Sequence, residues 1–190
     1  MPSILNFIEG EQIQFLVAGS ISPADAGTDW RAGGSPTIAV LTLASVADGA
    51  GRQSTKVDLG ALYAPQYDLF ACVDFTGETP SATETVDYYW APSPVSTEGN
   101  GNVAGNSGAD AAAPGGALGS ITLAEFILQC QWIGVLLTHN GAVVQNGFVG
   151  RFSPGARYGQ LIVVNNSGDV FEADDVEMHQ VMNPVVPESQ

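Results

Sequence analysis

Short apolar runs separated by glycine, proline, asparagine and aspartate recur along the whole chain, and this pattern is typical of an all-β protein. β-Branched and aromatic residues fill the runs, while glycine and asparagine supply the positive φ that tight turns need. The pattern predicts eight or nine strands, within residues 12–18, 37–45, 55–59, 66–75, 84–90, 126–137, 142–152, 158–165 and 176–186. The predicted fold class is all-β: an antiparallel, jelly-roll-like β-sandwich of two sheets.

Two runs and one turn carry the clearest pairing signals. In residues 66–75 every odd-numbered residue is apolar and the even-numbered ones are partly polar, so we expect one buried face. Residues 84–90 could return beside this run as its antiparallel partner. The dipeptide Asn140-Gly141 favours a tight turn, and it predicts a hairpin between the strands on either side.

Residues 122–137 fit two patterns. Thr122 and Glu125 match a helix-capping box, in which each side chain bonds the other residue's backbone N–H. From Ile127 onwards, however, apolar and polar residues alternate, and residues that favour strands crowd there. We therefore expect mainly strand from Phe126 onwards, and we predict no helix.

Residues 91–119 form the most unusual segment. After Pro92-Ser93-Pro94 they are largely Gly, Asn, Ser and Ala. A structureless loop of this length is uncommon inside a compact domain. It is a functional loop, a disordered loop or a segment ordered by a neighbouring subunit, and we favour the last. The length of the chain predicts one β-sandwich domain over residues 1–190, with an N-terminal arm at 1–11, the long Gly/Ala/Asn-rich loop at 91–119 and a C-terminal tail at 184–190.

Charge narrows the classes of partner. The chain has 20 acidic and 5 basic residues, which gives a formal net charge of −15. Phosphate backbones and anionic membranes attract clustered cations, so we expect no nucleic-acid binding and no membrane binding. A partner with a basic patch, or a divalent cation, is electrostatically allowed. The five cations are Lys56, Arg31, Arg52, Arg151 and Arg157.

The cysteines and the N-terminal residues indicate in which cellular compartment the chain is made. Cys72 and Cys130 lie in apolar runs, where they could bridge two strands or be buried free thiols. Free thiols are the preferred interpretation, because no other feature indicates an oxidising compartment. Residues 1–11 lack a basic region and a long apolar run, and no run reaches the ~18 apolar residues of a membrane helix. We expect synthesis in the cytosol, without a signal peptide.

No residue pattern predicts catalysis. His139 adjoins the Asn140-Gly141 turn, and His179 lies in the last predicted strand, so neither is expected to act as a base. Ser107 lacks the buried strand that precedes a nucleophile elbow. The chain has no P-loop, dinucleotide fingerprint or paired metal-ligand spacing. We therefore predict a non-enzymatic protein with no catalytic, cofactor-binding or metal-binding residues.

Acidic and aromatic clusters each have a functional and a structural interpretation. Acidic residues crowd the turn before the last strand and could hold Ca²⁺, but their spacing is not that of an EF-hand, and a solvated turn is preferred. Asp68 and Asp87 could face each other across strands, as glycosidase carboxylates do, although no groove is indicated. Aromatic residues could form a sugar-stacking platform, but aromatic residues on strands more often belong to the core. The acidic cluster consists of Asp169, Glu172, Asp174, Asp175 and Glu177. Two further acidic residues, Glu98 and Asp110, bracket the neutral loop. The aromatic residues are Trp30, Trp90, Trp132, Tyr88 and Tyr89.

Several short pieces occur in a characteristic order over about residues 28–188. They are GRQSTKVDLG at 51–60, VDYYW at 86–90 with its Ser-Pro follow-on, SGADAA at 107–112, ARYG at 156–159, VVNN at 163–166 and the acidic turn that leads to Glu177-Met178. In these pieces the chain resembles a group of small virion proteins of tailed bacteriophages, most of which have no assigned activity. None of the pieces is a catalytic motif, so the resemblance carries no functional residue across.

The resemblance implies a β-sandwich component of the virion, made in the host cytoplasm. The favoured interpretation is a capsid decoration, or cement, protein: a homo-oligomer such as a trimer that binds the major capsid protein or other virion proteins and stabilises the head. In this interpretation the four arginines are the cations available for carboxylate pairs between subunits, although an arginine on a β-sandwich is usually solvated or paired within its own chain. The alternatives are a tail or head-fibre component that binds a host-surface glycan and, least favoured, a glycan hydrolase.

Overall fold

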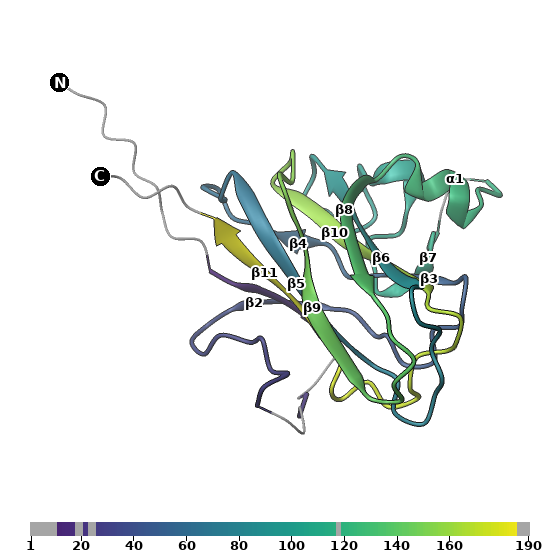
Figure 1. The fold of residues 1–190 in the computed structure, drawn as a ribbon. Helices are drawn as coiled ribbons and strands as arrows, with labels where there is room; N and C mark the ends of the chain where they lie inside the picture. The colour runs from purple at the N-terminus through teal and green to yellow at the C-terminus, as the bar shows by residue number, and fades with distance from the viewer. Residues whose placement is uncertain (1–10, 18–20, 23–25, 117–118, 186–190) are drawn as a thin grey trace.

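The computed structural model describes residues 11–17, 21–22, 26–116 and 119–185, and this part of the chain is built mainly of strands (Figure 1). The strands are β1 (Ile13–Leu16), β2 (Thr37–Val40), β3 (Gly51–Gln53), β4 (Val57–Asp58), β5 (Gln66–Asp74), β6 (Thr85–Ser93), β7 (Ala111–Ala113), β8 (Gln131–Leu137), β9 (Val144–Phe152), β10 (Tyr158–Asn166) and β11 (His179–Val185). One short helix, α1 (Leu123–Ile127), and one 3-10 turn, Val103–Gly105, accompany them. The predicted all-β class is confirmed.

The predicted ends of the chain fall largely outside this description. Of the arm expected at residues 1–11, only Glu11 is described, and it is exposed. The tail expected from residue 184 begins inside β11, which continues to Val185 because its residues pair with β5 as far as Gln66.

The strands form two sheets. One has the order β2-β1-β11-β5-β9, and the other has the order β7-β3-β10-β6-β8 with β4 also beside β10. The pairing is antiparallel in both sheets, apart from β1 and β2, which are parallel. The expected pairing of residues 66–75 with 84–90 is wrong: β5 lies between β11 and β9, and β6 lies between β10 and β8. Alternation identifies the buried face of a strand but does not identify its neighbours.

One continuous core lies between the sheets. The odd-numbered residues of β5 are buried in it, as the alternation predicts, and Tyr88 and Trp90 of β6 reach it from the other sheet. The indole Nε1 of Trp90 donates a hydrogen bond of 3.0 Å to the carbonyl oxygen of Pro154, so this large side chain is buried without an unpaired polar group. The core therefore joins both sheets into one packed unit.

Helix α1 corrects the strand expected from Phe126. The Thr122 hydroxyl accepts a hydrogen bond from the backbone N–H of Glu125, and the Glu125 carboxylate accepts one from the backbone N–H of Thr122. This capping box fixes the helix start, and Phe126 then packs on Ile162 and Val164 in a second, smaller core on the outer face of the β10 sheet. The capping signal prevailed because the helix buries an aromatic residue there.

The segment at 91–119 is more structured than expected. β6 continues to Ser93, the 3-10 turn follows at Val103–Gly105, and β7 pairs with β3 at Ala111–Ala113. Side chains from residues 51–60 hold residues 91–116 through contacts within the chain. The expected contribution of a neighbouring subunit stays a prediction.

The predicted hairpin at Asn140-Gly141 is also wrong in its pairing. β8 pairs with β6 and β9 pairs with β5, so the turn between β8 and β9 passes from one sheet to the other. The two edge strands nevertheless lie side by side (Figure 1), because glycine lets their backbones approach. A Cβ atom at Gly134 would lie 2.2 Å from the carbonyl oxygen of Val149, and one at Gly150 would lie 2.5 Å from that of Ile133.

The sheets also meet on the opposite side. The backbone N–H of Val40, in the edge strand β2, donates to the hydroxyl of Thr55, and the backbone N–H of Thr55 donates to the carbonyl oxygen of Val40. Thr55 lies between β3 and β4 of the other sheet, so this exchange links the two sheets. None of the helices in the described part of the chain is long and apolar enough to span a membrane.

Candidate functional site

The predicted chemistry-bearing residues do not assemble into one site. His139 lies exposed in the β8–β9 turn, where its Nδ1 accepts a hydrogen bond of 3.1 Å from the backbone N–H of Gly141. The Ser107 hydroxyl accepts from the side-chain amide of Gln53 at 3.0 Å, which makes it part of the loop scaffold. The structure therefore places these residues in turns and loops, as the sequence predicted.

His179 is buried on the outer face of the β1–β11–β5 sheet. Its Nε2 accepts a hydrogen bond of 3.1 Å from the backbone N–H of Trp30, so its Nδ1 carries the proton and donates to the carbonyl oxygen of Glu177 at 3.0 Å. Burial lowers the pKa of His179, against the opposing effects of the Glu177 hydrogen bond and the Asp29 carboxylate, 3.9 Å from Nε2. The neutral ring is thus a structural link between β11 and residues 29–31.

This link predicts a pH dependence of stability. The pKa of His179 is lower in the folded chain than in the unfolded chain, where it is about 6.5. The contribution of neutral His179 to the free energy of unfolding is therefore fully present above about pH 6.5 and is lost as the pH falls through the folded pKa. We expect the free energy of unfolding, measured in urea between pH 7.5 and 5, to fall with decreasing pH. His179 contributes at most about 1.4 kcal/mol per pH unit to this slope. His179→Gln is expected to remove that slope, whereas His139→Gln keeps it. Equal slopes in both variants would contradict the assignment.

The two cysteines are free, as preferred from the sequence. Cys72 is buried on β5, and Cys130 is half-buried after α1. Burial raises the pKa of each thiol to about 12. Because the thiolate is the nucleophile, both cysteines are poor candidates for reactive groups.

The acidic clusters separate into individual turns. Asp169 accepts hydrogen bonds from the backbone N–H groups of Thr79 and Val170, which lower its pKa. In the described residues no group of three or more His, Cys, Asp or Glu side chains is placed to hold a metal ion. Asp68 and Asp87 do not face each other, because they lie on β5 and β6 in different sheets.

Each arginine is paired inside the chain, which agrees with the local pairing expected of an arginine on a β-sandwich. The distances from Nε to the carboxylate oxygen are 2.7 to 2.9 Å. Sequence could not predict three of these pairs, because their partners lie 58 to 99 residues apart, whereas Arg31 and Asp29 are two residues apart. The pairs are Arg31–Asp29, Arg52–Asp110, Arg151–Asp68 and Arg157–Asp58.

The single lysine is occupied as well. Lys56 Nζ donates to the backbone carbonyl oxygens of Val95, Thr97 and Asn100 at 3.1, 2.7 and 2.8 Å. Partial burial lowers the pKa of Lys56, and the nearby Glu98 carboxylate opposes that shift. Lys56 thus anchors the start of the segment that follows β6.

Gln53 and Arg52 anchor the rest of that segment. The Gln53 side-chain amide donates to the carbonyl oxygen of Ala109 at 2.9 Å and accepts from the backbone N–H of Gly115 at 2.8 Å. Arg52 Nε donates to Asp110 at 2.9 Å, and Asp110 also accepts from the hydroxyl of Thr42 at 2.7 Å. The pieces at 51–60 and 107–112 therefore meet in space and have a structural role.

The aromatic residues divide between the core and the outer faces of the two sheets. Trp90 and Tyr88 are buried in the core, so they cannot stack on a ligand. Trp30 stacks on Phe70 on the outer face of the β5 sheet, with ring centroids 5.0 Å apart. Trp132 is exposed on β8 of the other sheet, so the five aromatic residues form no common platform.

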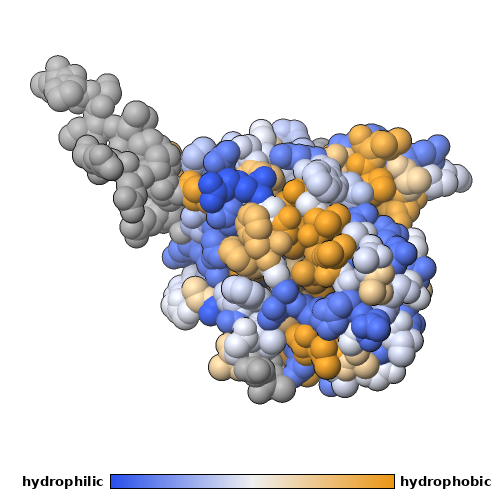
Figure 2. Space-filling view, in the orientation of Figure 1, coloured by the Kyte–Doolittle hydropathy of each residue, from blue (hydrophilic) through white to orange (hydrophobic). Residues whose placement is uncertain are grey.

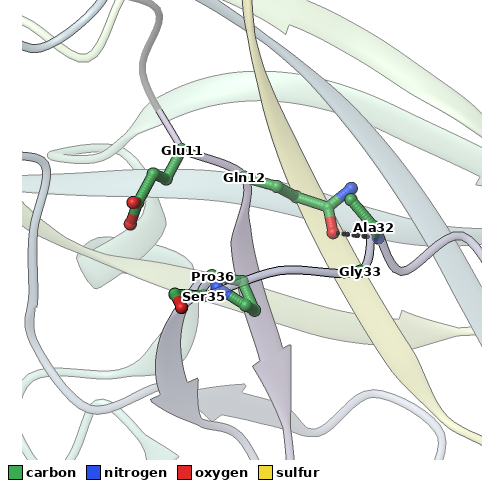
Figure 3. A pocket seen from close by; sticks show the side chains of 6 residues that line it. All are labelled: Glu11, Gln12, Ala32, Gly33, Ser35 and Pro36. Atoms are coloured by element: carbon green, nitrogen blue, oxygen red, sulfur yellow. Dashed lines mark hydrogen bonds between the residues drawn. The ribbon is translucent and has the colours of Figure 1, made fainter.

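A small hollow lies beside β1 and β2. Figure 3 shows the Gln12 side chain turned toward Ala32, whose backbone N–H donates to it at 2.7 Å. The hollow has a volume of about 110 Å³, which is below the roughly 300 Å³ of a small-molecule site. Its lining residues are Glu11, Gln12, Ala32, Gly33, Ser35 and Pro36. We interpret it as the imperfect fit of a loop that Gln12 holds in place.

The strongest candidate site is an apolar surface over the edge strands β8 and β9. Trp132, Leu137, Val143 and Phe148 expose 60%, 63%, 49% and 54% of their surface, respectively. Trp132 and Leu137 lie on β8, Phe148 lies on β9, and Val143 directly precedes β9. We call these four residues the seam surface; Figure 2 shows hydrophobic side chains gathered on the face that carries both strands.

The seam surface is unusual in chemistry and in place. Soluble proteins expose single apolar residues freely but rarely expose neighbouring large ones. Burying each side chain against a partner would stabilise a complex by roughly 2 kcal/mol, before the costs of association. Sequence reasoning missed this surface because Trp132 and Phe148 stand in strand patterns that predict core positions. Their exposure depends on the sheet edges, which the alternation does not identify.

Comparisons of the chain with known protein families, with curated proteins and with solved structures found no match.

Proposed function

We propose that this chain is a non-enzymatic structural protein of a bacteriophage virion, a capsid decoration protein that stabilises the head through protein–protein contacts. The observation that supports this most is the seam surface, since exposed neighbouring aromatic and aliphatic side chains mark protein contact sites. The favoured partner is the major capsid protein or another virion protein. The homo-oligomer expected from the resemblance stays a prediction.

The finer fold forms part of the proposal. We propose a single jelly-roll-like β-sandwich domain, and the strand order supports it. When the outermost strands β2 and β7 and the two-residue β4 are set aside, the strand orders are β1-β11-β5-β9 and β3-β10-β6-β8, so early and late strands of the chain alternate in each sheet. Eight strands in two such sheets are typical of jelly rolls, which occur in viral capsid proteins, lectins and cupins. Fold alone does not determine which of these functions applies.

One observation favours a second candidate, a tail or head-fibre component that binds a host-surface glycan. Trp132 lies opposite Tyr89 in the β6–β8 ladder, and its exposed ring could stack on a sugar. The apolar residues Leu137 and Val143 offer no hydrogen bonds to sugar hydroxyls, so a protein partner fits the seam surface better.

Cosedimentation tests the proposal. Capsids that lack this protein are mixed with the purified chain, pelleted, and analysed for bound protein and for resistance to heat. We expect saturable binding at a fixed ratio to the capsid protein and a higher temperature of capsid rupture. If the chain stays in the supernatant and instead binds host cells in a manner that soluble glycans inhibit, the glycan candidate replaces the decoration role.

A further inference from the structure

We propose that the seam surface docks a protein surface of opposite charge, apolar at its centre and carrying lysine or arginine at its rim. This inference rests on the proposed function and specifies the contact: the partner's basic, apolar patch covers Trp132, Leu137, Val143 and Phe148. The net charge of the chain disfavours a second copy as the occupant.

The apolar part of the argument is geometric. β8 and β9 are edge strands of different sheets, yet they adjoin, so their outward side chains form one surface across both sheets. A Cβ atom at Gly147 would lie 3.2 Å from the side chain of Leu136, and one at Gly134 would lie against the backbone of Val149, so little free space remains behind these strands. The exposed side chains therefore project from two strands whose backbones are closely packed against each other and against the core. Such rigid aromatic anchors give up little entropy on binding.

The charge of the surroundings selects the partner. Asp87 lies opposite Val135 and Thr85 lies opposite Leu137 in the β6–β8 ladder, so Asp87 and the exposed Glu84 border the seam surface. Arg151 lies on β9 itself, but its guanidinium is paired with Asp68, and the other four cations bind groups away from β8 and β9. No cation among the described residues is therefore paired with Glu84 or Asp87. A formal charge of −15 on each copy makes contact between two copies repulsive and contact with a basic surface attractive.

Matched variants test the apolar part, with capsids that lack the protein as the binding probe. Trp132→Ser and Phe148→Ser are expected to weaken binding about tenfold or more each. The control Leu62→Ser removes a side chain that is equally exposed, at 63%, but lies in the turn between β4 and β5. We expect the control to bind as the wild type does. All three changes lie at exposed positions, and melting curves identify any variant that fails to fold.

Charge reversal tests the electrostatic part. Glu84→Lys beside the seam surface is expected to weaken capsid binding several-fold, whereas Glu11→Lys, at the far end of the other sheet, is expected to leave it unchanged. Wild-type binding is expected to weaken as NaCl rises from about 0.05 to 0.5 M.

The outcomes separate the two proposals. Wild-type binding with unchanged binding of both seam variants would overturn the docking site while leaving the decoration role intact. No wild-type binding at all would overturn the decoration role, and the docking inference with it. If the wild type is a dimer in sedimentation velocity and Trp132→Ser is a monomer, a second copy covers the seam surface and the opposite-charge partner is wrong.

Discussion

Replacing Gly134 with alanine is expected to lower the melting temperature by about 10 °C. The new Cβ atom would lie 2.2 Å from the carbonyl oxygen of Val149, which belongs to the backbone of β9 and cannot rotate away as a side-chain tip can. Overpacking of this kind costs about 3 kcal/mol, and each kcal/mol lowers the melting temperature by roughly 2–4 °C in a chain of this size. Differential scanning calorimetry at pH 7.5 measures the effect directly.

Gly33→Ala is the matched control. No atom lies within 4 Å of a Cβ at Gly33, and its backbone does not adopt a positive φ, so the melting temperature is expected to change by about 1 °C or less. Gly150→Ala places its Cβ 2.5 Å from the carbonyl oxygen of Ile133 and is expected to resemble Gly134→Ala. If Gly134→Ala melts at the same temperature as the wild type, β8 and β9 are not in close contact, and the seam surface lacks a rigid backbone support.

Asp110→Ala is expected to destabilise the chain by about 2 kcal/mol and to expose the segment after β6 to proteases. Its carboxylate binds Arg52 Nε at 2.9 Å and the Thr42 hydroxyl at 2.7 Å, and its side chain is only 15% exposed. Removing it leaves a largely buried arginine without its partner, which costs more than the pair itself contributes. Urea unfolding combined with limited proteolysis and mass spectrometry measures both effects, with new cleavage expected between residues 94 and 110.

Asp58→Ala provides the comparison for an exposed pair. Asp58 binds Arg157 at 2.7 Å, much as Asp110 binds Arg52, but 46% of its side chain is exposed. Solvent-exposed ion pairs contribute about 0.5 kcal/mol, so Asp58→Ala is expected to remain close to the wild type. An Asp58→Ala variant as unstable as Asp110→Ala would show that burial is not what distinguishes the two pairs.

The sequence predicted the strands better than it predicted their neighbours. The alternation in residues 66–75 identified the buried face of β5, and the β-branched runs identified β9 and β10, because side-chain burial leaves a local period of two. Strands from opposite ends of the chain pair in the sheets, as β1 does with β11, and no local sequence pattern indicates which strands will pair. The Asn140-Gly141 turn shows the consequence, since its local signal was correct for a turn and wrong for strand pairing.

The candidate site was less predictable than the fold. The missing catalytic pattern and the excess of acidic residues were visible in the sequence, whereas the arginine pairs depend on contacts between distant residues such as Asp58 and Arg157. The long segment after β6 looked unsupported because Lys56 and Gln53, which hold it, lie 37 or more residues earlier. Exposure of Trp132 and Phe148 follows from the edge positions of β8 and β9, which only the sheet order reveals.

The most direct test of the proposed role is cryo-electron microscopy of capsids that lack this protein, incubated with the purified wild-type chain. We predict ordered density at regular positions of the capsid lattice, fitted by the two-sheet fold with the β8–β9 seam surface against a basic, apolar patch of the shell. Bare capsids, or density in which Trp132 and Phe148 face solvent, would contradict it.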